Sequence, residues 1–163
     1  MEVYLLRHGI AEDAHSGMSD ADRALTQDGR RKLRRALEAA AQADVRPSLI
    51  LTSPLKRAIE TAEIAEEALG YKGKLVRTQA LSPGSNPQEA WAEIRSRRNE
   101  SAIMLVGHNP LFGALGGYLI GAPDAQIDMK KGAILRIDFE HFPPQPRGTL
   151  RWLLIPKLID NRS

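Results

Sequence analysis

Cysteine is absent from this sequence of 163 residues, and aromatic residues make up only 5% of it. The absence of cysteine excludes disulfide bonds, thiolate metal sites and cysteine nucleophiles. No apolar run approaches the roughly 20 residues that a membrane-spanning helix needs. The first residues also lack the basic segment and apolar stretch that mark a secretory signal peptide. We therefore expect no membrane association, and the cytoplasm is the default location.

Charge is not strongly biased toward either sign, because 23 basic side chains face 20 acidic ones. Much of the small basic excess lies in the segment "GRRKLRRALE", residues 29–38, where acids are sparse. Such a segment is usually a solvated helix face, although it could also steer an anionic partner toward the protein. The sequence carries no recognition motif and no interleaved aromatic and basic residues that would indicate nucleic-acid binding. A nucleic-acid module is therefore the least expected class.

Short apolar runs alternate with longer segments of helical periodicity along the chain. The runs expected to form strands span residues 3–6, 48–52, 74–77, 102–106, 133–139 and 150–155. This alternation predicts an α/β fold, a three-layer α/β/α sandwich with a mostly parallel sheet of about six strands and helices on both faces. The last two runs flank the proline-rich "EHFPPQPRGT", so we expect that pair to be antiparallel. One domain over residues 1–163 accounts for the whole chain.

Four helices are expected where apolar periodicity follows a capping residue. The expected caps are Thr26, Ser53, Asn86 and Asn109. The last three precede a proline, which suits the first turn of a helix. The helices are expected over residues 27–43 and 54–69 and from residues 87 and 110 onward, the last ending near Gly121. Glu89 is in position to complete a capping box at the third helix.

Arginine and histidine recur just after three of the expected strands. Arg7 and His8 follow the first strand, Arg57 lies near the helix start after the second, and His108 follows the fourth. Ligands in open parallel sheets bind beyond the carboxyl ends of the strands. We therefore expect these four side chains to gather around one crevice.

This set of residue types suits a phosphoryl group. Two guanidinium groups can bind phosphoryl oxygens in a bidentate way, and two imidazoles offer a nucleophile and a donor. Gly9 and Gly107 are expected to let the backbone turn sharply and a ligand approach closely. No carboxylate cluster follows the strands, so we expect no metal ion and no cofactor. Each motif alone occurs commonly at surfaces or as a local backbone contact, and only their joint placement indicates a functional site.

Four segments together resemble the histidine phosphatase superfamily, also called the phosphoglycerate mutase-like family. They are "RHG" at residues 7–9, "DRALTQDGRR" at 22–31, "TSPLKRAIETA" at 52–62 and "VGHNP" at 106–110. Chain size makes the small SixA-type phosphohistidine phosphatases the most similar group, and the resemblance covers roughly residues 1–120. It implies that His8 is the nucleophile and that Arg7, Arg57 and His108 surround the phosphoryl oxygens.

The same resemblance suggests further phosphate contacts by Gly9, Arg23 and Asn109, with Arg23 at the rim of the pocket. Ser53 is expected to cap its helix and not to touch phosphate. The chain departs from the family at Glu60, where glutamine is frequent, and at Ala11, where a small hydroxyl residue is frequent. We expect one ring nitrogen of His8 to donate to a backbone carbonyl, which leaves the other free to attack.

Related mutases and phosphatases usually carry an acid after the third strand, where this chain has Leu81, Ser82 and Pro83. An alkoxide leaving group needs such an acid, whereas a protonated imidazole does not. The resemblance therefore favours a phosphohistidine phosphatase in signal transduction. Its substrate would be a phosphorylated protein of the histidine phosphotransfer type, and the short segment after the second helix leaves little room for a lid.

Two other functions stay open at this point. One is a broad-specificity phosphomonoesterase acting on a small phosphorylated molecule, with Glu12, Asp13 or Glu89 as the acid. The other is a non-catalytic phosphate-binding or protein-interaction module, which would have no need for His8. The sequence does not indicate an oligomeric state.

Overall fold

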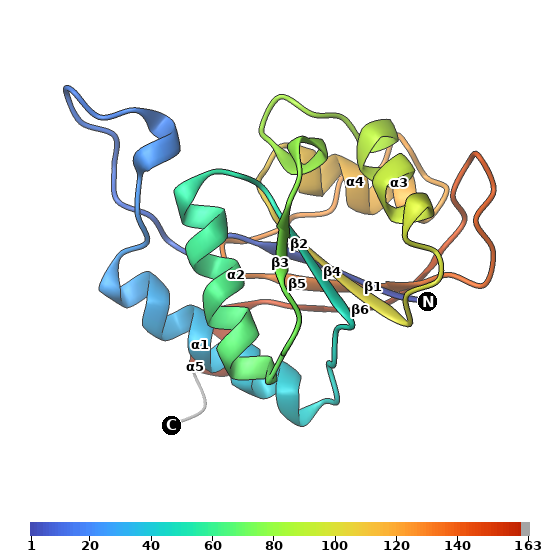
Figure 1. Ribbon diagram of the computed structural model, residues 1–163, viewed down its shortest axis with the longest axis horizontal. Coiled ribbons are helices and arrows are strands. Elements are labelled where there is room, and N and C mark those ends of the chain that lie inside the picture. Colours follow the sequence, from blue (N-terminus) through green and yellow to red (C-terminus); the bar gives the residue numbers. More distant parts are fainter. Residues whose placement is uncertain (161–163) are drawn as a thin grey trace.

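A six-stranded sheet forms the middle layer of the protein in the computed structural model, which describes residues 1–160 (Figure 1). The strands are β1 (Glu2–Arg7), β2 (Leu49–Thr52), β3 (Leu75–Arg77), β4 (Ala102–Gly107), β5 (Ile134–Asp138) and β6 (Thr149–Leu154). Their order across the sheet is β3-β2-β4-β1-β5-β6. The first four are parallel, whereas β5 and β6 run antiparallel to their neighbours. The predicted α/β class and the antiparallel final pair are confirmed.

Helices cover both faces of the sheet (Figure 1). One layer holds α1 (Gln27–Gln42), α2 (Lys56–Leu69) and the short α5 (Pro156–Asp160), and the other holds α3 (Pro87–Ser96) and α4 (Leu111–Leu119). Two short 3₁₀ helices, η1 (Asp20–Asp22) and η2 (Gln79–Leu81), lie in the connections. None of the helices within residues 1–160 is both long and apolar enough to cross a membrane.

Alternation along the strands divides the interior into two apolar cores. In β1, Val3 and Leu5 pack with residues of α3 and α4, whereas Tyr4 and Leu6 pack with residues of α1 and α2. Every residue of β4 is buried, as expected for a central strand covered on both faces. The helices are therefore held against the sheet by two separate hydrophobic layers, which fix the ends of β1, β2 and β4.

Two of the four predicted caps are confirmed. The Gly29 N–H donates to Thr26 Oγ1 over 2.9 Å, and the Glu89 N–H donates to Asn86 Oδ1 over 2.9 Å. The Glu89 carboxylate does not close a capping box, because it accepts a hydrogen bond from the Ser85 hydroxyl instead.

The predicted starts of the other two helices are early, by two residues at the second helix and by one at the fourth. α2 begins at Lys56 and α4 at Leu111, and neither has a capping hydrogen bond from the residue directly before it. The side chains expected to cap, those of Ser53 and Asn109, take part in contacts at the sheet edge described below. Ser53 Oγ still accepts from the Leu55 N–H and Asn109 Oδ1 from the Gly113 N–H, so each side chain combines a local contact with a tertiary one.

Candidate active site

His8 directly follows the last residue of β1 and forms the floor of the site at this edge of the sheet. Only 6% of its surface is exposed. Its Nδ1 is 2.7 Å from the carbonyl oxygen of Gly9, and the Gly9 N–H donates to Thr61 Oγ1 over 3.2 Å. A carbonyl only accepts, so Nδ1 carries the proton and Nε2 keeps its lone pair. The expected hydrogen bond from His8 to the backbone is thus present, and it leaves Nε2 available as a nucleophile.

His108 faces His8 from the end of β4, with 5.1 Å between the ring centroids. Its Nε2 is 2.7 Å from Ser53 Oγ, and its Nδ1 is buried with no hydrogen-bond partner. Ser53 therefore orients His108 across the sheet, and the expectation that it only caps a helix is wrong. The unpartnered Nδ1 is a polar atom that a ligand would have to satisfy.

Two guanidinium groups complete the bottom of the site, that of Arg57 buried and that of Arg7 half-buried. Arg57 is almost fully buried; its Nη1 donates to the Asp20 carbonyl over 2.8 Å and its Nη2 to Asp20 Oδ2 over 3.1 Å. Arg7 donates from Nη1 to the Met129 carbonyl over 2.8 Å. The Nε atoms of both arginines are buried without a partner. These two N–H donors suit the oxygens of a tetrahedral anion.

The structure thus brings together Arg7, His8, Arg57 and His108, as predicted from their places after three strands. The order β2-β4-β1 explains this, because it makes the three strand ends direct neighbours. Arg7 is paired in register with Gly107, the last residue of β4.

Arg23 and Asn109, two of the residues suggested as further phosphate contacts, lie in different parts of the site. Arg23 lies at the rim, where its Nη1 donates to Asp20 Oδ1 over 3.0 Å and its Nε to the Glu12 carbonyl over 2.8 Å. Asn109 donates to the Met129 carbonyl over 3.1 Å and accepts from the Gly113 N–H over 3.3 Å. Asn109 therefore supports the segment that holds Arg7 and has no amide hydrogen bond directed at the centre of the site.

The expectation for the two glycines needs correction. Neither Gly9 nor Gly107 has a positive φ, so neither is needed for a sharp turn. The N–H of Gly9 is occupied by Thr61 and is not offered to a phosphate. At Gly107 a Cβ would come within 2.8 Å of the Phe112 ring, so glycine is required there by packing.

Burial and nearby cations keep both imidazoles neutral. Burial lowers the pKa of His8 to about 4, and Arg57, Arg7 and Lys131 add to this effect against the Gly9 hydrogen bond. Burial also lowers the pKa of His108 to about 3, with further contributions from His8 and Arg57. Both pKa values lie below the ordinary value of 6.5. Between about pH 4 and pH 6.5 the unfolded chain therefore binds more protons than the folded protein does. The stability from these two groups is present above pH 6.5 and is lost as the pH falls toward 4.

We expect the acid limb of kcat/KM to lie near pH 4 and not near pH 6.5. His8 can attack only as the neutral imidazole, and its pKa of about 4 keeps it neutral down to that pH. The profile would be measured with p-nitrophenyl phosphate, corrected for ionisation of the substrate. A His15→Ala variant, which removes an exposed histidine, should leave the limb in place. A limb at pH 6 or above would contradict this reading of the site.

None of the three acids considered from the sequence contacts the four central side chains. Glu12 accepts from the Ala24 N–H, Glu89 is bound to Ser85 in the other helical layer, and Asp13 is exposed. Glu60 accepts from the Leu25 N–H and pairs with Arg30, so it anchors the start of α1. Asp20, which the sequence analysis did not single out, is the carboxylate that reaches the site.

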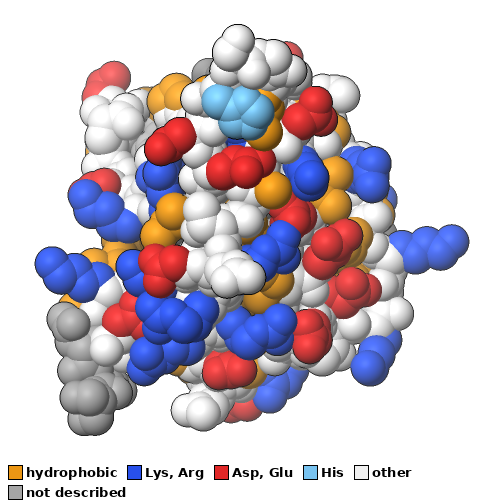
Figure 2. Space-filling view, turned by 90° about the vertical axis from the view of Figure 1, so that its left-hand side faces the viewer, with side chains coloured by type: hydrophobic (Ala, Val, Ile, Leu, Met, Phe, Trp, Pro, Cys, Tyr) orange, Lys and Arg blue, Asp and Glu red, His pale blue; other side chains and the backbone are white. Residues whose placement is uncertain are grey.

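No group of three or more histidine, aspartate or glutamate side chains within residues 1–160 is arranged to hold a metal ion. The basic face of α1 is largely matched by acids. Arg30 pairs with Glu60, Arg34 with Glu67, Lys32 with Asp28, and Arg31 and Arg35 with Asp160. On the side of the protein that carries α1, basic and acidic side chains are intermixed (Figure 2). The solvated-face interpretation therefore fits better than an anion-steering one.

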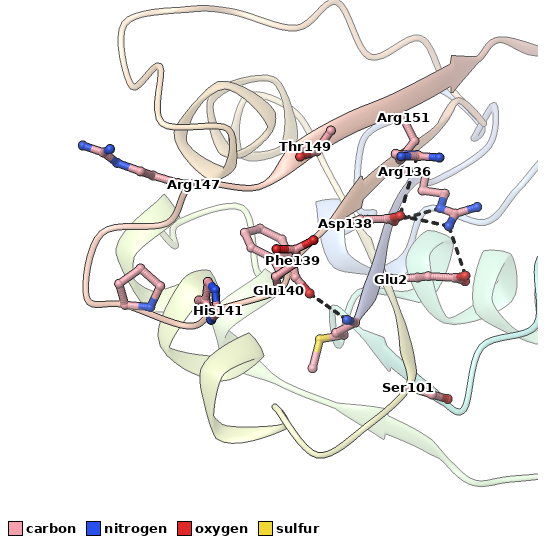
Figure 3. A pocket seen from close by; sticks show the side chains of 12 residues that line it. Glu2, Ser101, Arg136, Asp138, Phe139, Glu140, His141, Arg147, Thr149 and Arg151 are labelled. Atoms are coloured by element: carbon pink, nitrogen blue, oxygen red, sulfur yellow. Dashed lines mark hydrogen bonds and ion pairs between the residues drawn. The ribbon is translucent and has the colours of Figure 1, made fainter.

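A cavity of about 670 Å³ lies at the opposite end of the sheet, where β1 begins. Its charged side chains are largely paired with one another (Figure 3): Arg136 with Glu2 and Asp138, and Arg151 with Asp138. The Met1 ammonium donates to the Phe139 carbonyl over 2.7 Å. Most of the opposite charges in this cavity thus neutralise one another, and the cavity lies at the other end of β1 from His8.

Comparisons with known proteins agree with this geometry. A family model described as the histidine phosphatase superfamily (branch 1) matches residues 3–82. The chain is 33% identical over 137 residues to an uncharacterised protein of Picosynechococcus sp., a match that covers 83% of each chain. It is 44% identical over 72 residues to the 2,3-bisphosphoglycerate-dependent phosphoglycerate mutase of Thermobifida fusca, which covers 42% of this chain and 28% of the mutase. The structure of the protein histidine phosphatase SixA complexed with tungstate superposes with a TM-score of 0.88 at 23% identity, covering 97% of this chain and 99% of that one.

Proposed function

This chain belongs to the histidine phosphatase superfamily and is a phosphatase with the fold of SixA; from that premise we propose that it removes phosphoryl groups from histidine side chains of other proteins. The observation that carries the substrate class is the composition of η2. This segment follows β3 and lies against the end of β4, where the Leu81 carbonyl approaches Gly107. It contains Gln79, Ala80 and Leu81, so it presents no carboxylate to the site.

The proposed reaction proceeds in two steps. His8 Nε2 forms a bond to phosphorus while the bond from phosphorus to the substrate nitrogen breaks, and that nitrogen takes the electron pair. Arg7, Arg57 and His108 stabilise the charge on the transferred oxygens. Water then attacks the phosphorus on His8, releases inorganic phosphate and returns the electron pair to Nε2.

The leaving group explains why η2 can lack an acid. Alkyl phosphates leave as poor alkoxides unless a proton is delivered to the oxygen. A phosphorylated imidazole that is protonated on its other nitrogen leaves as a neutral ring and needs no such delivery. The site therefore suits phosphohistidine better than a sugar phosphate, and a protein that displays phosphohistidine would place this phosphatase in signal transduction.

The test is a substrate panel. A histidine phosphotransfer domain carrying phosphohistidine would be compared with sugar phosphates and other small monoesters at the same enzyme concentration. We expect kcat/KM to be at least about a hundredfold higher for phosphohistidine, in line with the loss of one acid–base contribution on the monoesters. Preference for the monoesters would support a broad phosphomonoesterase instead. Phosphate binding without turnover of any substrate would support a binding module.

A further inference from the structure

Asp20 holds a distinctive place at the mouth of the site. Among residues 1–160 it alone puts a carboxylate within 4 Å of a side-chain nitrogen of the four central residues, through its 3.1 Å contact with Arg57 Nη2. Its other carboxylate oxygen accepts from Arg23 Nη1 over 3.0 Å. The side chain of Asp20 is 60% exposed, whereas that of Arg57 is 7% exposed. The carboxylate therefore stands between the buried Arg57 guanidinium and solvent.

The Asp20 carboxylate competes with a phosphoryl group for one edge of Arg57. The buried Nε of Arg57 has no partner and its Nη2 is held by Asp20, and these two nitrogens form the fork that binds oxyanions. An arriving phosphoryl group would displace the carboxylate from Nη2. Asp20 would nevertheless stay at the mouth, because its main-chain carbonyl is held by Arg57 Nη1 and its other oxygen by Arg23.

The nucleophile and Asp20 lie at opposite depths of the site. His8 is 6% exposed at the floor, so a phosphoryl group that it attacks must carry its leaving group toward solvent. The reacting bonds in phosphoryl transfer are roughly in line, which places the leaving group on the side of the mouth. Asp20 places its carboxylate on that side, against Arg57 Nη2.

We propose that the Asp20 carboxylate accepts a hydrogen bond from the free ring N–H of the substrate phosphohistidine and so holds the leaving imidazole in its protonated, reactive form. This inference rests on the proposed function and names the residue that recognises the leaving group. Arg23, and then Arg57, lower the pKa of Asp20, so the carboxylate is ionised at neutral pH and acts as an acceptor, not as a proton donor.

The step balances without another reactant. The bond from His8 Nε2 to phosphorus forms, and the bond from phosphorus to the substrate nitrogen breaks with its electron pair on that nitrogen. The ring proton stays on the other nitrogen, hydrogen-bonded to Asp20, and the histidine leaves neutral. A charge-assisted hydrogen bond of this kind is roughly twice as strong as a neutral one. An alkyl monoester has no ring N–H, so the carboxylate offers it no such contact.

The test is Asp20→Asn measured on two substrates, the phosphohistidine-bearing phosphotransfer domain and p-nitrophenyl phosphate. We expect kcat/KM on phosphohistidine to fall about tenfold or more relative to its change on the monoester. Loss of Asp20 also frees the Arg57 fork, so binding of inorganic phosphate should tighten. Asp22→Asn removes the same charge from η1 without a contact to Arg57, and it should alter neither the ratio of activities nor phosphate binding.

Equal losses on both substrates would overturn the inference, because a merely structural role for Asp20 would affect them alike. Asp20→Ala with retained thermal stability provides a second variant that lacks any side-chain acceptor, and it should show the same substrate-dependent loss. If the wild-type protein does not act on phosphohistidine, the proposed function fails before the variants are compared. A wild-type protein that is active on phosphohistidine, with unchanged ratios in both Asp20 variants, would refute the role of Asp20 alone.

Discussion

Replacing His8 with alanine is expected to lower kcat by roughly 10⁴-fold or more and to abolish covalent labelling by a radiolabelled phosphoryl donor. The reason is that Nδ1 of His8 is bound to the Gly9 carbonyl, so its Nε2 keeps a lone pair for attack on phosphorus. Labelling would be read after rapid acid-free denaturation, because phosphohistidine is unstable in acid. The fold should survive, because a neutral buried ring is removed and no charge is left unpaired.

His15→Ala provides the matched control, since His15 is exposed and its Nδ1 contacts only the neighbouring Ser16 carbonyl. That variant should label and turn over like the wild type. His108→Ala should slow turnover and still accept the label, because His108 supplies a donor and its Nε2 is held by Ser53. Label that persists in His8→Ala and disappears in His108→Ala would reverse the assignment of the two histidines.

The meeting of Arg7, His8, Arg57 and His108 could be predicted because it follows from one general property of parallel sheets. Residues just after the strands share an edge, whatever the order of the strands. The order itself, with β5 antiparallel beside β1, was not predictable, because the apolar runs do not encode which neighbour each strand takes.

The supporting contacts of the site could not be predicted, since they depend on long-range packing. Ser53 and Asn109 have the local pattern of helix caps, and beside their local backbone contacts their side chains reach His108 and the Met129 carbonyl, respectively. Asp20 has the same polar surroundings in the sequence as Asp13 and Asp22. Only the position of η1 against α2 selects Asp20 as the partner of Arg57. A local pattern therefore identifies residues that the chemistry needs, but not those that position them.

Arg7→Met is expected to move activity and stability in opposite directions. Arg7 forms no ion pair within 4 Å among residues 1–160, and burial lowers its pKa although the charge of Asp128 acts in the opposite direction. The folded state therefore keeps a half-buried cation without a direct carboxylate partner. Methionine fills a similar volume without charge, which should raise the free energy of unfolding by about 1 kcal/mol and Tm by about 2–4 °C. The same change removes a phosphoryl donor and should lower kcat/KM by about 10²–10³.

Inorganic phosphate should separate these two effects in thermal unfolding. An anion that binds only the folded state raises Tm, so the wild-type protein should become more stable as phosphate is added. The Arg7→Met variant should have a higher Tm without phosphate, and its Tm should rise much less as phosphate is added, because one of the two arginines that bind the anion is gone. Arg34→Met, on the exposed face of α1, removes a cation that is already paired with Glu67 and should change neither quantity. A less stable Arg7→Met variant whose Tm rises with phosphate as in the wild type would contradict this prediction. It would mean that Arg7 stabilises the fold through its hydrogen bond to the Met129 carbonyl and does not bind the anion.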